Sequence, residues 1–458
     1  MPDSETEIPV RSVSRPRSSA PFFPRILEMI LAAGRGMLEG RWAGEVGPGT
    51  LADRCKLLLT HRGDASGLAL AEEVISSYEQ LSQSEQTEFL GTLSKDFAID
   101  SEAVLRAADR YRENQTLETV TALRKSLDPP VKKLFRKLNA VPGGTRATVK
   151  IRERLLALTA EHPELSGLEA DLRQLLIEWF NRGFLVLDRI DWDSPASVLE
   201  RIIEYEAVHE INGWEDLHNR LRQDRRCFAF FHMTIPGDPL IFLQVALTNG
   251  VPGAVAPLLA VDRDVIDQYA ADTAVFYSIS NCHRGLRGIS FGHFLIKQVV
   301  EVLRQDLGNI RNFATLSPIP GFRRWVENAQ ADGLPVPRSA DLRSARELLA
   351  GAGVADLEGY GQDAQAAFVR LAAYYLVEVK REDEQPLDSV ARFHLANGAS
   401  IDRLCWAADV SETGMKRSWG MMVNYIYEPK EIEKNHERYF QAGEVAMSSR
   451  VRKLARGR

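Results

Sequence analysis

Cysteine is scarce in this sequence, and that scarcity excludes two classes of site. The 458 residues include four cysteines, and Cys55, Cys227, Cys282 and Cys405 are too far apart to form a CxxC pair. Zinc ribbons need closely spaced cysteine pairs, and disulfide scaffolds need a denser set. The pattern favours a reducing compartment, and we expect a cytoplasmic protein.

A convincing membrane-spanning run is also lacking. Residues 239–261 carry no charge and are numerous enough to cross a bilayer. However, the stretch contains the hairpin-turn signal Asn249-Gly250 and the helix-breaking residues Pro252 and Pro257. We therefore expect two buried strands joined by a turn, in a soluble protein without a membrane partner.

An excess of positive charge is missing as well. Lys and Arg number 57 against 63 Asp and Glu, which gives a formal net charge of -6. Proteins that bind nucleic acid or anionic membranes usually carry a basic excess, so we expect no nucleic-acid partner. The nine histidines form no HExxH motif, and we predict no bound zinc or iron. Any affinity for an anionic ligand must be local.

The length predicts two or three domains. The tail over residues 1–24 is rich in Arg, Ser and Pro and lacks the apolar core of a secretory signal, so we expect a disordered leader. Apolar residues then recur with a helical period over residues 25–190, with breaks at 128–130 and 142–144. This pattern predicts a helical bundle that mediates oligomerisation, giving a homodimer or homotetramer.

The pattern of apolar residues changes over residues 191–458. Helical stretches at 196–208 and 291–307 alternate with β-rich runs, which predicts an α/β or α+β domain around one mixed sheet. The expected strands cover residues 227–233, 240–247, 273–280, 312–316 and 401–407. We also expect a helical insertion around residues 339–379 and a closing helix over 431–453.

A loop at residues 281–293 links one predicted strand to a predicted helix. Its glycines let the backbone approach a ligand, the following helix directs its positive dipole end towards the loop, and Arg284 and Arg287 add charge. This arrangement suits a pyrophosphate, although a plain turn with solvated arginines has the same appearance. The loop lacks the GxxxxGK[ST] and GxGxxG spacings, which disfavours a nucleotide triphosphatase or a Rossmann dehydrogenase.

Two further residues stand at turns. Ser317 follows an apolar run and precedes Pro318, Pro320 and Gly321, which fix a rigid turn at the end of a strand. His394 lies just before the turn signal Asn397-Gly398. Taken singly, each residue is also compatible with a purely structural role. No GxSxG motif surrounds Ser317, which disfavours an α/β-hydrolase nucleophile.

In this order, the loop, Ser317 and His394, followed by Tyr427, resemble the catalytic domain of the malonyl-CoA decarboxylase family, whose active domain is related to GNAT-type acetyltransferases. The resemblance is carried mainly by residues 230–427. It implies an α+β fold, with an all-helical N-terminal bundle followed by a GNAT-like mixed-sheet catalytic domain. Ser317 and His394 match the catalytic pair of the family.

The resemblance also implies a set of substrate-binding residues. Ser290 departs from the family pattern, because some members carry a glutamate there. The implied residues are Ser278, Arg284, Arg287, Gly288, Ile289, Ser290, Phe291, Gly292, His293 and Tyr427.

The implied reaction converts malonyl-CoA to acetyl-CoA and CO2 through an enolate that is protonated at the α-carbon. No cofactor is expected, because the thioester carbonyl accepts the electrons. We expect His394, in its protonated form, to deliver the proton, with Ser317 binding the substrate and relaying it. Two alternatives remain open: an acyl-CoA N-acyltransferase, and a non-catalytic acyl-CoA sensor.

Overall fold

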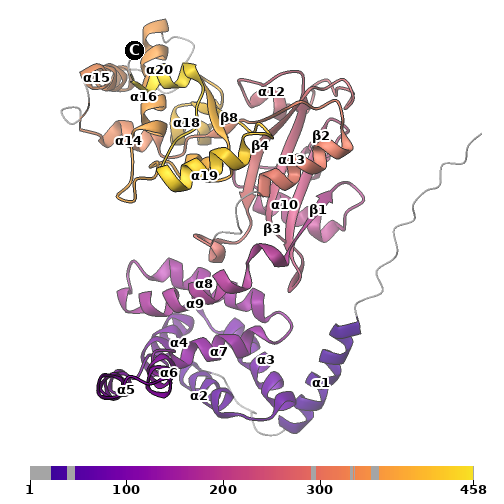
Figure 1. Cartoon of the computed structure of the whole chain (residues 1–458). Helices are drawn as coiled ribbons and strands as arrows, with labels where there is room; N and C mark the ends of the chain where they lie inside the picture. The colour runs from indigo at the N-terminus through magenta and orange to yellow at the C-terminus, as the bar shows by residue number, and fades with distance from the viewer. Residues whose placement is uncertain are drawn as a thin grey trace, which may run out of the picture. The chain divides into compact units, whose positions relative to one another are not determined.

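The computed structural model describes residues 22–38, 47–289, 295–330, 334, 336–351 and 361–456. The chain divides into two compact units, Met1–Leu175 and Leu176–Arg458 (Figure 1). Residues 1–21 of the predicted leader lie outside the described residues. Its last three residues, 22–24, form the start of helix α1. The division comes before residue 190 because β1 (Leu185–Ile190) already pairs with the sheet of the second unit.

The described residues of the first unit form helices and no strand. The predicted breaks are confirmed: Pro130 lies in the first turn of one helix, and Gly143, with φ of 76°, precedes the next. The helices are α1 (Phe22–Leu38), α2 (Pro48–Thr60), α3 (Asp64–Gln80), α4 (Gln83–Asp96), α5 (Ser101–Glu113), α6 (Leu117–Ser126), α7 (Pro130–Asn139), α8 (Gly144–Leu158) and α9 (Ser166–Trp179), the last of which continues into the second unit.

The second unit is built on an eight-stranded sheet. Seven strands follow the order β1-β2-β3-β4-β5-β8-β6, and β7 also pairs with β8. The β4–β5 pair is parallel, and the other pairs are antiparallel. This mixed sheet after a helical bundle confirms the predicted α+β class. After β1, the strands are β2 (Arg225–His232), β3 (Ile235–Thr248), β4 (Thr273–Asn281), β5 (Asn312–Thr315), β6 (Ser317–Pro318), β7 (Ser400–Cys405) and β8 (Met422–Ile426).

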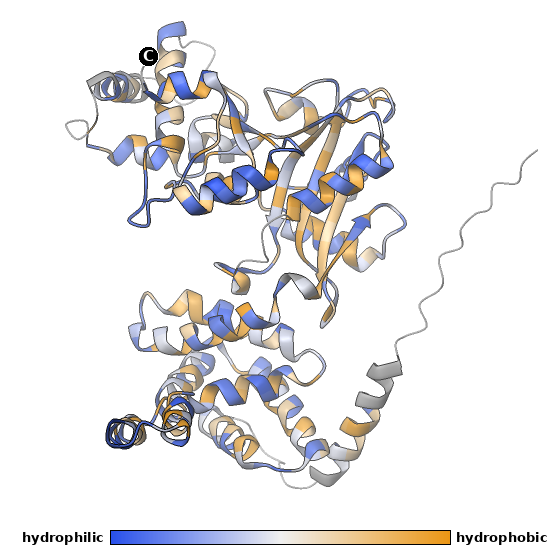
Figure 2. Cartoon of the chain, viewed as in Figure 1, coloured by the Kyte–Doolittle hydropathy of each residue, from blue (hydrophilic) through white to orange (hydrophobic). Residues whose placement is uncertain are grey.

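Hydrophobic residues are frequent on the central strands of the sheet (Figure 2). Phe228, Phe242 and Val275 of β2, β3 and β4 are all buried. The predicted strands at 227–233, 240–247, 273–280, 312–316 and 401–407 are present, whereas β1, β6 and β8 were not expected. Burial of both faces of β8 removes the alternation of polar and apolar residues that would mark a strand in the sequence, and β6 has only two residues.

The charge-free stretch 239–261 forms one strand, not two. Its first part lies in β3, and Gly250 turns the chain with φ of 76°. The second predicted strand is wrong, because the chain continues instead into α12 (Ala256–Leu259) with Pro257 in its first turn. Proline has no N–H group to donate to a strand ladder, and it suits the start of a helix. Among the described residues, no helix is both long and apolar enough to cross a membrane.

Helices flank this sheet, and α15 and α16 lie in the stretch for which a helical insertion was predicted, although residues 352–360 of that stretch lie outside the described residues. The predicted closing helix is wrong, because Gly443, with φ of 62°, ends α19 and leaves α20 as a separate helix. The helices of this unit are α10 (Ala196–Tyr205), α11 (Trp214–Asn219), α13 (Leu295–Asp306), α14 (Phe322–Asn328), α15 (Val336–Gly351), α16 (Gln362–Val377), α17 (Ser389–Ala396), α18 (Glu412–Ser418), α19 (Ile432–Ala442) and α20 (Ser449–Arg456).

Candidate active site

Ser317 is fixed by the junction of three strands. It lies on β6 opposite Val423 of β8, immediately after β5 ends at Thr315. The side-chain amide of Asn424 donates a hydrogen bond to the Thr315 carbonyl at 2.8 Å, which ties β8 to this junction. Pro318 follows and has no N–H group, so the short strand stops there. Ser317 is only 5% exposed.

His394 is carried by the short helix α17. Asp388 caps the start of this helix, because its Oδ1 accepts hydrogen bonds from the N–H groups of Val390 at 3.0 Å and Ala391 at 2.9 Å. Gly398 follows the helix with φ of 83°, and a Cβ there would lie 2.2 Å from the Ile432 carbonyl oxygen. This glycine lets the chain turn sharply into β7, which leaves His394 in the last helical turn.

The two predicted catalytic residues are in contact. Ser317 Oγ lies 3.0 Å from His394 Nε2, and His394 Nδ1 lies 2.8 Å from the Tyr427 hydroxyl. Ser317 Oγ also donates to Thr315 Oγ1 at 2.8 Å. The four side chains therefore form one continuous chain of hydrogen bonds, contributed by β5, β6, α17 and the residue after β8.

These contacts assign the tautomer of His394. Within the described part of the chain, the Tyr427 hydroxyl has one recorded hydrogen-bond partner, His394 Nδ1. A buried phenol normally donates its proton, so the Tyr427 hydroxyl is the donor. Nδ1 then accepts, and Nε2 carries the proton that is donated to Ser317 Oγ. Since the Ser317 proton is directed towards Thr315, the imidazole does not act as a base towards this serine.

His394 is neutral in this environment. Burial lowers the pKa of His394 to about 3, and its ring stacks on Tyr425 with centroids 4.4 Å apart. Burial also raises the pKa of Tyr427 well above its usual value. The protonated histidine expected from the sequence is therefore wrong for this environment, because no described carboxylate contacts the ring to stabilise an imidazolium.

A cavity of about 250 Å³ opens onto the serine and the histidine. It brings together three of the predicted residues, Ser278, Ser317 and His394. Apolar side chains form much of the remaining wall, which favours an acyl group and limits access of water. The lining residues are Val208, Phe276, Tyr277, Ser278, Ile279, Asn281, Ser317, Pro318, Ser389, Val390, Phe393 and His394.

The other predicted residues do not line this cavity. Arg284 and Arg287 are exposed beside a short 3-10 helix (Arg284–Leu286), Gly288 has φ of 74°, and Ile289 is buried. Tyr427 lies behind His394. Ser290, Phe291, Gly292 and His293 lie outside the described residues.

Sequence reasoning missed four residues that support the site: Glu206, Thr315, Asp388 and Tyr425. Thr315 and Tyr425 stand two positions from Ser317 and Tyr427, so strand alternation could have indicated them. Asp388 could have been recognised as a helix cap if α17 had been expected. Glu206, whose carboxylate accepts hydrogen bonds from Ser278, gives no local signal, because the two residues are far apart in the chain.

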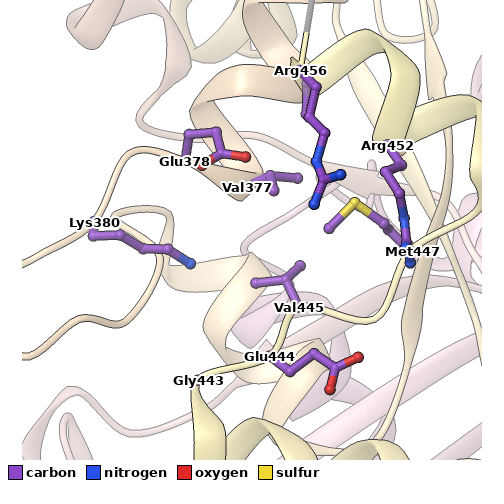
Figure 3. Close-up of a pocket in the computed structure, with 10 residues that line it drawn as sticks. Val377, Glu378, Lys380, Gly443, Glu444, Val445, Met447, Arg452 and Arg456 are labelled. Carbon is purple, nitrogen blue, oxygen red and sulfur yellow. The ribbon is translucent and has the colours of Figure 1, made fainter.

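A second cavity, of about 420 Å³, contains none of the predicted site residues. It lies between the end of α16 and the helix α20, and Figure 3 shows Lys380 and Arg456 directed towards its space. Neither a serine nor a histidine lines it. Within the described ranges, no group of three or more His, Cys, Asp or Glu side chains is placed to hold a metal ion.

Comparison with known proteins identifies relatives of the whole chain. Residues 183–458 match the malonyl-CoA decarboxylase C-terminal domain, and residues 97–180 match the malonyl-CoA decarboxylase N-terminal domain. The mitochondrial malonyl-CoA decarboxylase of Anser anser anser is 32% identical, over 93% of this chain and 94% of the relative. The mitochondrial malonyl-CoA decarboxylase of Rattus norvegicus is 34% identical, over 83% of this chain and 84% of the relative.

Solved structures give the same result. The malonyl-CoA decarboxylase from Rhodopseudomonas palustris is 44% identical, with a TM-score of 0.86, and the match covers 89% of this chain and 100% of that one. The malonyl-CoA decarboxylase from Agrobacterium vitis is 45% identical, with a TM-score of 0.81, and the match covers 88% of this chain and 99% of that one.

Proposed function

We propose that Ser317, His394 and Tyr427 carry out the reaction of the malonyl-CoA decarboxylase family, to which this chain belongs. The chain is a carboxy-lyase that converts malonyl-CoA to acetyl-CoA and CO2. The observation that supports this assignment is the contact of 3.0 Å between Ser317 Oγ and His394 Nε2 at the wall of a largely apolar cavity.

The reaction begins with cleavage of the bond between the carboxylate and the α-carbon. The electron pair of that bond moves into the thioester, so CO2 leaves and an enolate remains. The apolar walls contributed by Phe276, Val390 and Phe393 favour this step, because they destabilise the localised charge of the carboxylate more than the charge that is spread over the enolate. The thioester is the electron acceptor, so the proposed reaction uses no cofactor.

The enolate then takes one proton at the α-carbon. In our proposal, the Ser317 hydroxyl gives its proton to the carbon and receives the Nε2 proton of His394. A neutral imidazole can act in this way because a thioester enolate is a much stronger base. Tyr427 holds the tautomer by donating to Nδ1. A proton from solvent restores His394, so each turnover consumes one proton.

The test of this relay is the reaction in D2O. We expect acetyl-CoA with one deuterium in its methyl group, since the relay protons exchange with solvent. His394→Gln should lower the rate of this labelling together with the rate of CO2 release. Rapid CO2 release by the variant, with labelling unaffected, would show that the proton comes from another group.

We also propose that the loop after β4 holds the CoA part of the substrate. Asn281, at the end of β4, lines the cavity, and the exposed cations Arg284 and Arg287 follow within a few residues. Gly288 adopts a positive φ of 74°, which allows close approach of the backbone to a phosphate. A ligand that reaches from this loop into the cavity would bring its acyl end to Ser317 and His394.

A cytoplasmic location and a homo-oligomer complete the proposal. All four cysteines are free, as expected for a reducing compartment. In the first unit, Leu105 and Leu117 are 65% and 81% exposed, and apolar side chains of this size often become buried between subunits. We propose a homodimer or homotetramer formed through the helical unit.

A further inference from the structure

Glu206 lies directly behind the wall of the catalytic cavity. It follows helix α10, and both of its carboxylate oxygens accept the Ser278 hydroxyl, each at 2.8 Å. One of these oxygens also accepts the backbone N–H of Val208 at 2.8 Å. Ser278 and Val208 line the cavity, so the carboxylate contacts two residues of the cavity wall.

The other recorded contacts of Glu206 are all with hydrogen-bond donors. They are the backbone N–H of His209 at 3.0 Å, the Ser280 hydroxyl at 3.2 Å and the side-chain amide of Gln244. A carboxylate accepts hydrogen bonds and cannot donate them, so this set of partners fits the carboxylate form of Glu206. Within the described ranges no cation forms an ion pair with it, and the nearby Arg220 is already bound to Asp216 at 2.9 and 3.0 Å. Glu206 therefore places a negative charge beside the cavity.

This arrangement determines what Ser278 can offer a substrate. Its single proton is directed towards Glu206, so it presents lone pairs, not a donor, to the cavity. A wall that accepts hydrogen bonds and is backed by a negative charge disfavours a bound carboxylate. The carboxylate of malonyl-CoA becomes neutral CO2 in the reaction, while its charge moves to the thioester oxygen. The wall therefore raises the energy of the bound substrate more than that of the transition state.

We propose that Glu206 is a positioning residue that fixes Ser278 with its lone pairs towards the cavity and thereby destabilises the substrate carboxylate before CO2 is released. The inference rests on the proposed function of this site. It adds a residue from outside the loop and outside the hydrogen-bonded chain of Ser317, His394 and Tyr427.

The first experiment measures kcat and KM of Glu206→Gln with malonyl-CoA. Glutamine has nearly the same shape but no charge, so the variant should bind the substrate more tightly and convert it more slowly. We expect KM to fall at least about threefold and kcat to fall about tenfold, the signature of lost ground-state destabilisation. A merely structural role would lower kcat with KM unchanged or raised, and that result would overturn the proposal.

Two further variants separate charge from shape. Glu206→Asp retains the charge and should not lower KM. Glu204→Gln removes a carboxylate two positions earlier, which is 58% exposed and bound to Arg201, and should leave both constants unchanged. A similar fall in KM for Glu204→Gln would show that the effect is not specific to the cavity wall, and would contradict the proposal.

A binding measurement tests the same idea without turnover. CoA thioethers that carry either a carboxylate or a carboxamide in place of the malonyl group cannot lose CO2. Calorimetry with the wild-type protein should give at least about threefold tighter binding of the carboxamide, and Glu206→Gln should remove this preference. Equal binding of both compounds by the wild-type protein would overturn the proposal even if the variant failed to fold. Absence of decarboxylation by the wild-type protein would instead contradict the proposed function.

Discussion

At the scale of single residues, the environment of His394 decides its chemistry. The imidazole is buried, stacks on Tyr425 and contacts hydroxyl groups at both nitrogens. In a Ser-His-Asp triad, a carboxylate stabilises the imidazolium that forms when histidine takes a proton from serine. A neutral tyrosine occupies that position here. This arrangement supports our proposal that the site gives a proton to a strong base and does not activate a serine nucleophile.

The role of Tyr427 leads to the first prediction. Tyr427→Phe removes the hydroxyl that donates to His394 Nδ1, so the tautomer with a proton on Nε2 is no longer favoured. We expect kcat to fall about tenfold, with KM little changed. The nitrogen-15 chemical shifts of His394 should show a larger share of the other tautomer.

Tyr425→Phe is the matched control for this change. The ring of Tyr425 stacks on the same histidine, but its buried hydroxyl has no recorded hydrogen-bond partner in the described structure. The control should keep both kcat and the nitrogen shifts of the wild-type protein. An equal loss of activity in both variants would argue that aromatic packing alone, and not the Tyr427 hydroxyl, matters.

The second prediction concerns stability and pH. Burial lowers the pKa of His394 from 6.5 to about 3, so below pH 6.5 the unfolded chain binds a proton that the folded protein excludes. The folded state should lose stability as the pH falls from 6.5 towards 3, by up to about 1.4 kcal/mol per unit. Urea denaturation between about pH 4.5 and 7 should show this loss, and His394→Gln should reduce the slope. An unchanged slope in the variant would contradict a buried neutral histidine.

At the scale of the elements, short connections hold the site together. Ser317 belongs to a strand of two residues, and His394 to a helix of eight. Neither element could persist alone in water, since isolated short helices and strands are unstable. The pairing of β6 with β8 and the cap at the start of α17 therefore become part of the catalytic arrangement.

The third prediction tests the cap of α17. Asp388→Ala removes the acceptor for two backbone N–H groups and should lower the unfolding free energy by about 1–2 kcal/mol. Because the same helix carries His394, we also expect a lower kcat. Thermal melting and steady-state kinetics would measure both effects.

Asp388→Asn provides the comparison, since asparagine caps helices equally well. Burial raises the pKa of Asp388 to about 6, so a charge is held in an apolar setting at neutral pH. The asparagine variant should therefore keep kcat and be at least as stable as the wild-type protein at pH 7. A loss of activity in this variant would indicate that the carboxylate has a function other than capping.

The sequence predicted the long elements better than the short elements. Ser317 and His394 were identified from their resemblance to a family, and the structure brings them into contact. Helix α17 was missed because the sequence signal there was the turn Asn397-Gly398, which marks where the helix ends. The neutral state of His394 could not be predicted, because burial is a property of the folded core and not of the neighbouring residues in the chain.

Glu206 shows the same limit more sharply. Nothing near it in the sequence distinguishes it from the exposed Glu204, and its contacts come from β3 and β4. Pairing of these strands brings Gln244 opposite Ser278, and this register gathers the donors around one carboxylate. A single sequence contains the residues of such a cluster but not the register that assembles it.

At the scale of the whole molecule, the chemistry belongs to the second unit. Every residue that lines the catalytic cavity lies between Val208 and His394. The first unit contributes none of these lining residues, and in our proposal it serves assembly with other copies. Its exposed leucines on α5 and α6 are consistent with this separation of roles.

The fourth prediction follows from these leucines. In the full-length protein, light scattering after size-exclusion chromatography should give two or four times the mass of one chain. Leu105→Lys combined with Leu117→Lys should lower that mass, because a charge in an apolar interface is costly. Gln115→Lys, in the exposed connection between α5 and α6, is the control and should leave the mass unchanged. A monomeric wild-type protein would rule out the proposed oligomer.

The most direct test of the whole account is to incubate the purified full-length protein with malonyl-CoA and measure acetyl-CoA and CO2 by mass spectrometry, with His394→Gln alongside. We predict equal amounts of the two products from the wild-type protein and a rate at least about 100-fold lower from the variant, with similar KM. His162→Gln, which changes a partly exposed histidine of the first unit, should behave as the wild-type protein. Undiminished product formation by His394→Gln would contradict the assignment of His394 as the proton donor. Absence of products from the wild-type protein would contradict the proposed function itself.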